Sequence, residues 1–195
     1  MPNSLIDWNV ATRSLSGESG DQYLVREMPS RALVAVIDGL GHGPEAAAAA
    51  KTAVAVLDGC DEPSLAALMT RCHENLRGTR GAVLSIASIE PGSLTWLGVG
   101  NVDGVLLRSG LGPPAHLLVR GGVVGHRLPS LDVSRTSLAR GDTLVLSTDG
   151  VHRHFVERPE VTYSAPPTAE RILSDFGKET DDALVLVVRY FGDRR

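Results

Sequence analysis

Short apolar runs separated by Gly, Pro, Asp and Ser dominate the pattern of this chain. Runs of this length that end at turn-forming residues are typical of β-strands. The pattern predicts strands at residues 5–11, 22–27, 32–37, 82–89, 94–99, 102–107, 116–119, 143–146 and 184–191. Short turns at 90–93, 100–101 and 120–122 connect the strands between residues 82 and 127, which predicts antiparallel meanders in that part of the chain.

Three segments have helical spacing instead, at residues 44–57, 65–76 and 167–176. The first opens at Pro44, whose missing N–H is tolerated in the first turn of a helix. The second repeats apolar residues every three or four positions between Pro63 and Gly78. Many strands with two helices inserted between them and one late helix predict an α+β fold. We expect two antiparallel sheets packed face to face, with the helices outside.

The composition describes an ordinary globular protein. The 195 residues fit one domain over residues 1–195, and they can bury a sizeable core without a disulfide or zinc. A net charge of −4 with no long charged run argues against nucleic-acid or membrane binding. Cys60 and Cys72 have no disulfide or metal-site spacing, and the N-terminus shows no signal peptide. We therefore expect a cytoplasmic protein with both cysteines reduced.

Four aspartates stand where strands begin or end, each beside Gly or another Asp: Asp21, Asp38, Asp149 and Asp181. Mg²⁺ and Mn²⁺ prefer carboxylate, carbonyl and water oxygens, and carboxylates from distant strands can hold two such ions. Two metals can activate a water and clamp a phosphoryl group. The alternative is structural, because Asp149-Gly150 is a common hairpin turn and Asp38 suits a helix cap.

Taken together, four motifs resemble the metal-dependent protein phosphatase (PPM) family in its bacterial SpoIIE-like branch. They are Gly20-Asp21-Gln22-Tyr23, Asp38-Gly39-Leu40-Gly41-His42-Gly43, Ser147-Thr148-Asp149-Gly150 and Asp181-Asp182-Ala183. The short chain and the segment 98–106 are similar to the stand-alone phosphatases of the RsbX type, which reset the stressosome. The resemblance implies an α-β-β-α sandwich, a dinuclear Mn²⁺ or Mg²⁺ site, and hydrolysis of phosphoserine and phosphothreonine on STAS-domain proteins of the RsbR and RsbS types.

The resemblance also assigns roles to the acidic residues. Asp38 would bridge both metals, and Gly39 would give its backbone carbonyl to one of them. Asp149 and Asp181 would hold the other metal, while Asp21 would orient a water on the metals. Asp182 would support the site without binding an ion.

The chain departs from the pattern of the eukaryotic relatives at two places. Leu40 stands where those relatives have a histidine that is a proposed general acid, and His42 lies two residues later. His42 is therefore either that acid or a turn residue packed at the start of a helix. Arg13 lies eight residues before Asp21, so its match to the phosphate-binding arginine of those relatives is left open. Arg153 and His154 either border the cleft or belong to a solvated loop.

Two other functions are consistent with these residues. A catalytically silent PPM-fold protein would bind a partner without hydrolysing it, and a metallohydrolase would act on a small phosphomonoester. All four acidic positions are intact, which favours an active phosphatase.

Overall fold

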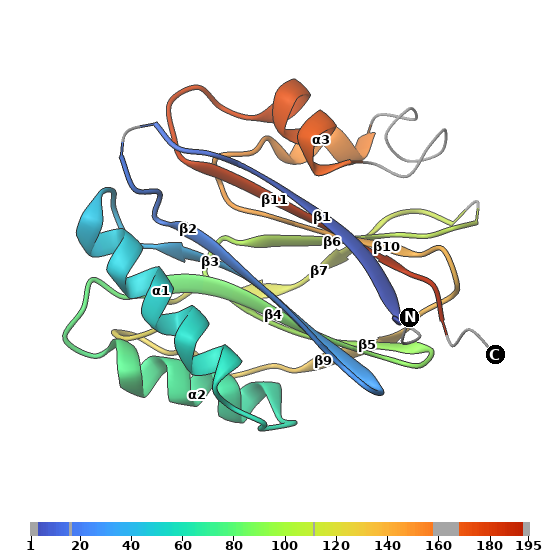
Figure 1. Ribbon diagram of the computed structural model, residues 1–195, viewed down its shortest axis with the longest axis horizontal. Helices are drawn as coiled ribbons and strands as arrows, with labels where there is room; N and C mark the ends of the chain where they lie inside the picture. The colour runs from blue at the N-terminus through green and yellow to red at the C-terminus, as the bar shows by residue number, and fades with distance from the viewer. Residues whose placement is uncertain (1–3, 16, 111, 158–167, 193–195) are drawn as a thin grey trace.

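The computed structural model describes residues 4–15, 17–110, 112–157 and 168–192. Two β-sheets are stacked face to face at its centre, and helices cover both outer faces (Figure 1). The first sheet has the order β1 (Ile6–Arg13), β11 (Ala183–Tyr190), β10 (Thr143–Ser147), β6 (Asp103–Leu107), β7 (Ala115–Leu117). The second has the order β2 (Asp21–Met28), β3 (Arg31–Gly39), β4 (Ala82–Glu90), β5 (Ser93–Val99), β8 (Val119–Arg120), and β9 (Ser134–Ser137) also pairs with β5.

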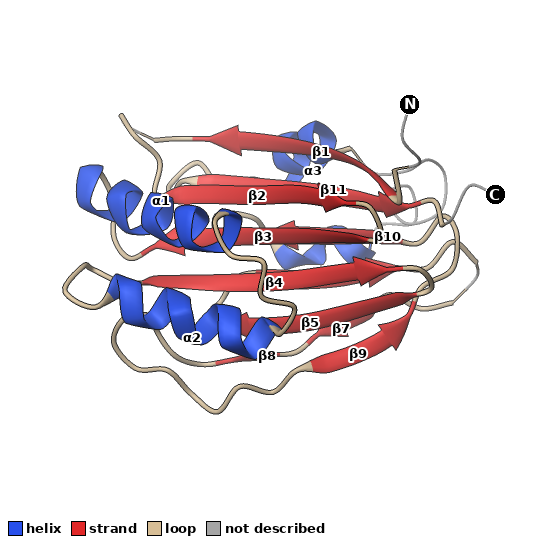
Figure 2. Ribbon diagram, turned by 60° about the horizontal axis from the view of Figure 1, so that its bottom comes forward, coloured by secondary structure: helices blue, strands red, loops and turns tan. Residues whose placement is uncertain are grey.

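The helices form the two outer layers. Helices α1 (Pro44–Asp58) and α2 (Leu65–Leu76) lie side by side over the second sheet (Figure 2). Helix α3 (Ala169–Phe176) and a short 3₁₀ helix (Arg153–Glu157) pack on the first sheet. The arrangement confirms the predicted α-β-β-α sandwich. The expected start of the third helix at Pro167 falls outside the described residues.

Residues 32–37 of strand β3 form one unbroken apolar run, and both faces of the strand are buried there. Val34 and Val36 point into the core between the two sheets. Leu33, Ala35 and Ile37 point the other way, into the core beneath α1 and α2. Since successive side chains of a strand point to opposite faces, one continuous apolar run supplies both cores.

Helix α1 lies very close to the end of β3. Its alanines Ala46, Ala49 and Ala50 are fully buried, and their small side chains allow the close approach. A Cβ atom on Gly39 would lie 2.1 Å from the carbonyl oxygen of Ala46, so only glycine fits at this point. The backbone of Gly39 is thereby fixed against the first turn of the helix, directly after Asp38.

The predicted hairpin turn at residues 100–101 is wrong. Strands β5 and β6 belong to different sheets, so the chain crosses the sandwich there. Gly100 has φ of 105°, and a Cβ on it would lie 2.2 Å from the side chain of Val83. The carbonyl of Val102 accepts a hydrogen bond from the buried Ser85 hydroxyl at 2.8 Å, which holds the crossing in place.

The single strand predicted at residues 116–119 is also wrong. It divides into β7 in the first sheet and β8 in the second, with Leu118 between them. The carbonyl of Leu118 accepts a hydrogen bond from the indole N–H of Trp96 at 2.9 Å, outside both ladders. In addition, β8 runs parallel to β5, so the second sheet is not purely antiparallel, and β9 was not expected.

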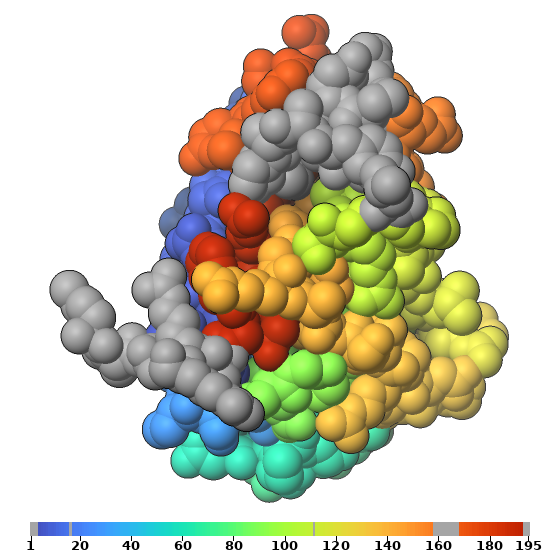
Figure 3. Space-filling view, turned by 90° about the vertical axis from the view of Figure 1, so that its right-hand side faces the viewer, coloured from blue at the N-terminus to red at the C-terminus, as the bar shows by residue number. Residues whose placement is uncertain are grey.

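The two ends of the sandwich differ. The start of β1 and the end of β11, which are paired at Ile6 and Tyr190, lie at one end (Figure 1). Seen from that end, the last strand (red) lies between the blue N-terminal strand and the orange segment near residue 140 (Figure 3). The candidate site lies at the opposite end, where β2 and β11 begin. None of the helices in the described part of the chain has the length and apolar character needed to cross a lipid bilayer.

Candidate functional site

Asp21 and Asp38 lie opposite each other on neighbouring strands, at the end of the second sheet where β2 begins and β3 finishes. Asp21 is the first residue of β2, Asp38 is next to last in β3, and the two are paired in the antiparallel register. Asp21 is only 5% exposed, and its carboxylate accepts a hydrogen bond from the Thr148 hydroxyl at 2.8 Å. Thr148 follows β10, so this bond joins the second sheet to the first. The same hydroxyl oxygen accepts the backbone N–H of Leu184 at 2.9 Å.

Asp149 and Asp181 come from the first sheet. Asp149 follows the end of β10, and Asp181 stands just before β11, the strand that pairs with β10. A Cβ on Gly150 would lie 1.9 Å from the carbonyl oxygen of Asp182, so glycine is required where these two segments meet. Both aspartates are exposed and, with Asp38, line one cleft of 550 Å³. The structure therefore brings carboxylates from four separate segments to one end of the sandwich.

The clustered carboxylates change one another's protonation. Burial, and after it the charges of Asp21, Asp149 and Asp181, together raise the pKa of Asp38 to about 8. Burial also raises the pKa of Asp21 to about 7, against the lowering effect of the Thr148 hydrogen bond. Among the ion pairs of the described residues, none involves Asp21, Asp38, Asp149 or Asp181. A divalent cation would compensate their negative charge, because a nearby positive charge favours the ionised carboxylate.

The donor set fits a hard cation. All the candidate ligands are oxygens, the atoms that Mg²⁺ and Mn²⁺ prefer. Among the residues that the structure describes, no three acidic, histidine or cysteine side chains converge closely enough to form a complete ligand shell. Mg²⁺ commonly keeps several waters and takes only one or two carboxylates, so an incomplete protein shell is compatible with such an ion.

Two further residues support the cluster, and sequence reasoning did not single them out. The amide of Asn101 donates a hydrogen bond to the carboxylate of Asp149 at 2.7 Å, and Thr148 binds Asp21. Both stand inside segments that carried the family resemblance. An asparagine or a threonine in the sequence does not indicate that it will bind a carboxylate. Only the folded structure shows these contacts.

Asp182 has a structural position. Its carboxylate accepts the backbone N–H groups of Leu15 at 2.9 Å and Gly20 at 3.0 Å. Burial tends to raise the pKa of Asp182, but these hydrogen bonds outweigh that effect and the pKa falls below its ordinary value. The side chain thus holds the connection between β1 and β2, just before Asp21.

His42 and Arg13 have different surroundings. His42 is exposed and lines the same cleft as Asp38 and Asp149. The Arg13 guanidinium instead donates a hydrogen bond to the carbonyl of Lys178 and lies close to Gly177. The residues that line the cleft do not include Arg13.

Arg153 and His154 line a second hollow, which shares Asp149 with the cleft. Arg153 forms an ion pair with Asp103 there. These two residues therefore border the site, on the side of the first sheet.

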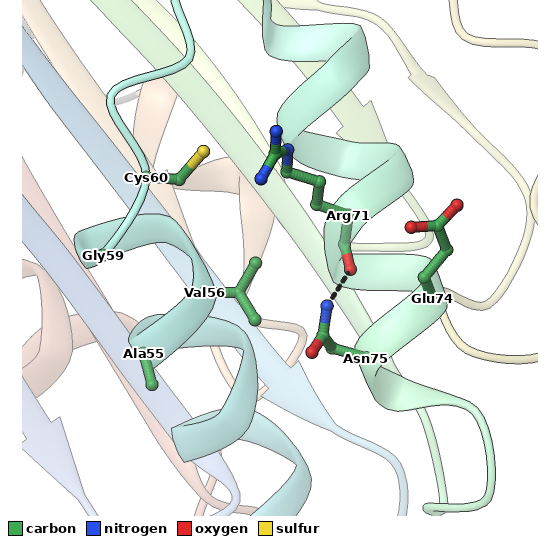
Figure 4. Close-up of a pocket in the computed structure, with 7 residues that line it drawn as sticks. All are labelled: Ala55, Val56, Gly59, Cys60, Arg71, Glu74 and Asn75. Atoms are coloured by element: carbon green, nitrogen blue, oxygen red, sulfur yellow. Dashed lines mark hydrogen bonds between the residues drawn. The ribbon is translucent and has the colours of Figure 1, made fainter.

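A separate groove lies between α1 and α2 on the outside of the second sheet (Figure 4). Arg71 and Asn75 point from α2 towards α1, and Cys60 faces them from just after α1, while Glu74 also lines the groove but points away from α1. The Asn75 amide donates a hydrogen bond to the carbonyl of Arg71 at 2.8 Å. Glu74 is the one carboxylate of its lining, so this groove does not offer the donor set of the cleft.

Comparison with known proteins agrees with this geometry. The SpoIIE family (Stage II sporulation protein E) matches residues 29–191. A protein solved under the heading "The bacterial stressosome: a modular system that has been adapted to control secondary messenger signaling" is 31% identical, with 94% of this chain and 99% of that chain covered and a TM-score of 0.85. A comparison with curated proteins gives no significant match.

Two more distant structures share the fold. RsbX in complex with magnesium is 21% identical, with 95% of each chain covered and a TM-score of 0.81. The catalytic domain of the serine/threonine protein phosphatase PstP, in complex with two manganese ions, is 18% identical, with 95% of this chain and 98% of that chain covered and a TM-score of 0.69. Because the family match covers most of the sequence and the 31%-identical relative aligns along nearly all of it, the chain belongs to the SpoIIE family, a bacterial branch of the metal-dependent protein phosphatases.

Proposed function

We propose that this chain is a single-domain, metal-dependent serine/threonine phosphatase whose substrates are phosphorylated STAS-domain proteins of the stressosome, of the RsbR and RsbS types. The observation that carries the proposal is the pairing of Asp21 with Asp38, both with raised pKa values, beside Asp149 and Asp181. The 31%-identical relative, which was solved in the context of the bacterial stressosome, supports the choice of partner.

In this proposal Asp38, the carbonyl of Gly39, Asp149 and Asp181 hold two Mn²⁺ or Mg²⁺ ions. Bound metals of this kind lower the pKa of a water and neutralise charge on a phosphoryl group. The magnesium and manganese in the related structures support the choice of ion.

The other residues of the site would orient the attacking water and the metal-binding carboxylates. Asp21, fixed by Thr148, would accept a hydrogen bond from the attacking water and aim it at the phosphorus. Asn101 holds the Asp149 carboxylate through its amide. His42 stands in the wall of the same cleft, either as a general acid or as a turn residue.

The test uses a phosphorylated RsbS- or RsbR-type STAS-domain protein and the purified chain. After EDTA treatment we expect no loss of phosphate by mass spectrometry, and addition of Mn²⁺ should restore turnover more readily than Mg²⁺. Asp149→Asn should lose turnover in the same assay, and Asp175→Asn is its matched control, because Asp175 is a half-exposed aspartate on α3 that pairs with Arg171. Full activity of the metal-free protein would overturn the proposal.

The same experiment separates the competing functions. A binding-only protein would bind the phosphorylated partner but release no phosphate, whether Mn²⁺ or Mg²⁺ is added. A small-molecule phosphatase would hydrolyse p-nitrophenyl phosphate with Mn²⁺ but leave the phosphoprotein intact.

A further inference from the structure

A groove continues from the candidate site over the outer face of the first sheet to its β7 edge, where Val119 of β8 in the second sheet also lines it. The cleft that contains Asp38 and Asp149 shares Asp149 with the neighbouring hollow of 530 Å³. That hollow in turn shares Asp103, His116 and Arg153 with a third one of 300 Å³. The three hollows therefore adjoin one another and lead away from the carboxylates.

Strand register explains why the groove starts beside the site. Asp103 opens β6 and is paired with Ser147, two residues before Asp149. Strand spacings put Asp103 on the order of 10 Å from Asp149. Val105 packs in the core under α3, so Asp103, two residues earlier, points to the same outer face. His116 is paired with Val105 and extends that face on β7.

The groove changes character along its length. Next to Asp149 its walls are polar, and the Asp103–Arg153 ion pair stands where the second and third hollows meet. Beyond this pair the walls are mainly apolar, formed by Val105, Leu117, Leu118, Val119 and Phe155.

Leu118 is an exposed apolar residue at the far end of the groove. It lies at the crossing between the two sheets and is 85% exposed. A single exposed leucine is ordinary on a protein surface. This one borders an apolar hollow that connects with the candidate site, and covering it would remove apolar surface from water.

We propose that this groove is the docking surface for the protein substrate. In the complex, the surface beside the phosphorylated serine or threonine lies across the Asp103–Arg153 pair. It places an apolar side chain in the hollow between Leu117, Leu118 and Phe155. The inference rests on the proposed function and extends it: continuity with the cleft and the change from polar to apolar walls favour a protein partner over a small phosphoester, which cannot reach both ends.

The test is a specificity ratio, the kcat/KM for a phosphorylated STAS-domain protein divided by that for p-nitrophenyl phosphate. Leu118→Asp should lower this ratio at least about tenfold, because a buried carboxylate cannot replace an apolar contact. Leu118→Ser, a milder change, should lower it in the same direction. The matched control is Val133→Asp, since Val133 is an exposed apolar residue, 47% exposed, that lies outside the groove. The docking proposal would be overturned if both Leu118 variants kept the wild-type specificity ratio, or if Val133→Asp lowered that ratio equally.

Binding measurements keep this test apart from the proposed function. If the wild-type protein hydrolyses neither substrate, the phosphatase proposal fails on its own. The affinity of wild type and Leu118→Asp for the phosphorylated protein then decides the docking proposal. A loss of about tenfold or more supports the groove, and equal affinities refute it.

Discussion

Replacing Asp38 with asparagine should stabilise the metal-free protein. Burial and neighbouring carboxylates raise the pKa of Asp38 from the ordinary 3.8 to about 8. A carboxyl group whose pKa is higher in the folded state contributes stability while it is protonated. That contribution is fully present below about pH 4 and is lost as the pH rises towards 8. Asparagine carries no charge at any pH and avoids this loss.

The size of the effect follows from the pKa shift. A rise of about four units at ~1.4 kcal/mol per unit gives a ceiling of ~6 kcal/mol, of which ~5 kcal/mol is reached at pH 8, where the group is half ionised. Asp21 and Asp38 lie close together, so ionising one carboxyl group raises the free energy of ionising the other. A single substitution therefore relieves only part of the combined destabilisation. We expect a gain of at least ~2 kcal/mol, which for a chain of this size raises Tm by about 4–8 °C. At pH 5 most of the gain should vanish.

Thermal unfolding after EDTA treatment, at pH 5 and pH 8, measures this gain. Mn²⁺ should raise the Tm of the wild-type protein and have little effect on Asp38→Asn, because the variant lacks a ligand. A variant no more stable than wild type at pH 8, or a difference that is the same at both pH values, would refute the reasoning.

Asp142→Asn is the matched control with the opposite sign. Asp142 is also buried, and burial alone would raise its pKa. Hydrogen bonds from the backbone of Ala139 and Ser109 and from Arg108 instead hold the pKa below its ordinary value. Removing this charge should destabilise the protein at pH 8, with the same response to Mn²⁺ as wild type.

Three further predictions concern activity. Asp149→Asn should reduce turnover of a phosphoprotein to below about 1% of wild type at saturating Mn²⁺ while circular dichroism stays unchanged; substantial residual turnover would argue against a ligand role. His42→Ala should lower kcat less than tenfold, since the exposed ring lines the cleft as a turn residue, whereas loss of a general acid typically costs ~10²–10⁴-fold. An intact phosphorylated STAS-domain protein should have a much higher kcat/KM than an excised phosphopeptide with the same site, because remote contacts position the phosphate. Equal values for protein and peptide would point to recognition of local sequence.

Local patterns in the sequence were sufficient to predict most of the elements. Helix α2 begins and ends within the limits set by Pro63 and Gly78, and its apolar face is buried as its spacing predicted. The four aspartates could be found at strand ends because a strand stops where Asp and Gly interrupt an apolar run. Both signals depend on neighbours only a few residues apart, which a single sequence displays directly.

Membership of the two sheets was decided by the tertiary structure. The short link at Gly100 reads as a hairpin turn, yet it carries the chain from one sheet to the other. Nothing in the residues 98–104 distinguishes these outcomes, because the choice depends on contacts with Val83 and Ser85, more than ten positions away. The division of residues 116–119 between β7 and β8 has the same origin, in the contact of Leu118 with Trp96.

The chemistry of the site also depends on long-range packing. Thr148 reaches Asp21 across 127 positions of sequence, and Asn101 reaches Asp149 across 48. The raised pKa values of Asp21 and Asp38 arise only when burial and the other carboxylates act on them together. The sequence by itself determined which residues carry negative charge to the strand ends. The stacking of the two sheets decided that these charges meet, because it brings the ends of β2, β3, β10 and β11 to one edge of the sandwich.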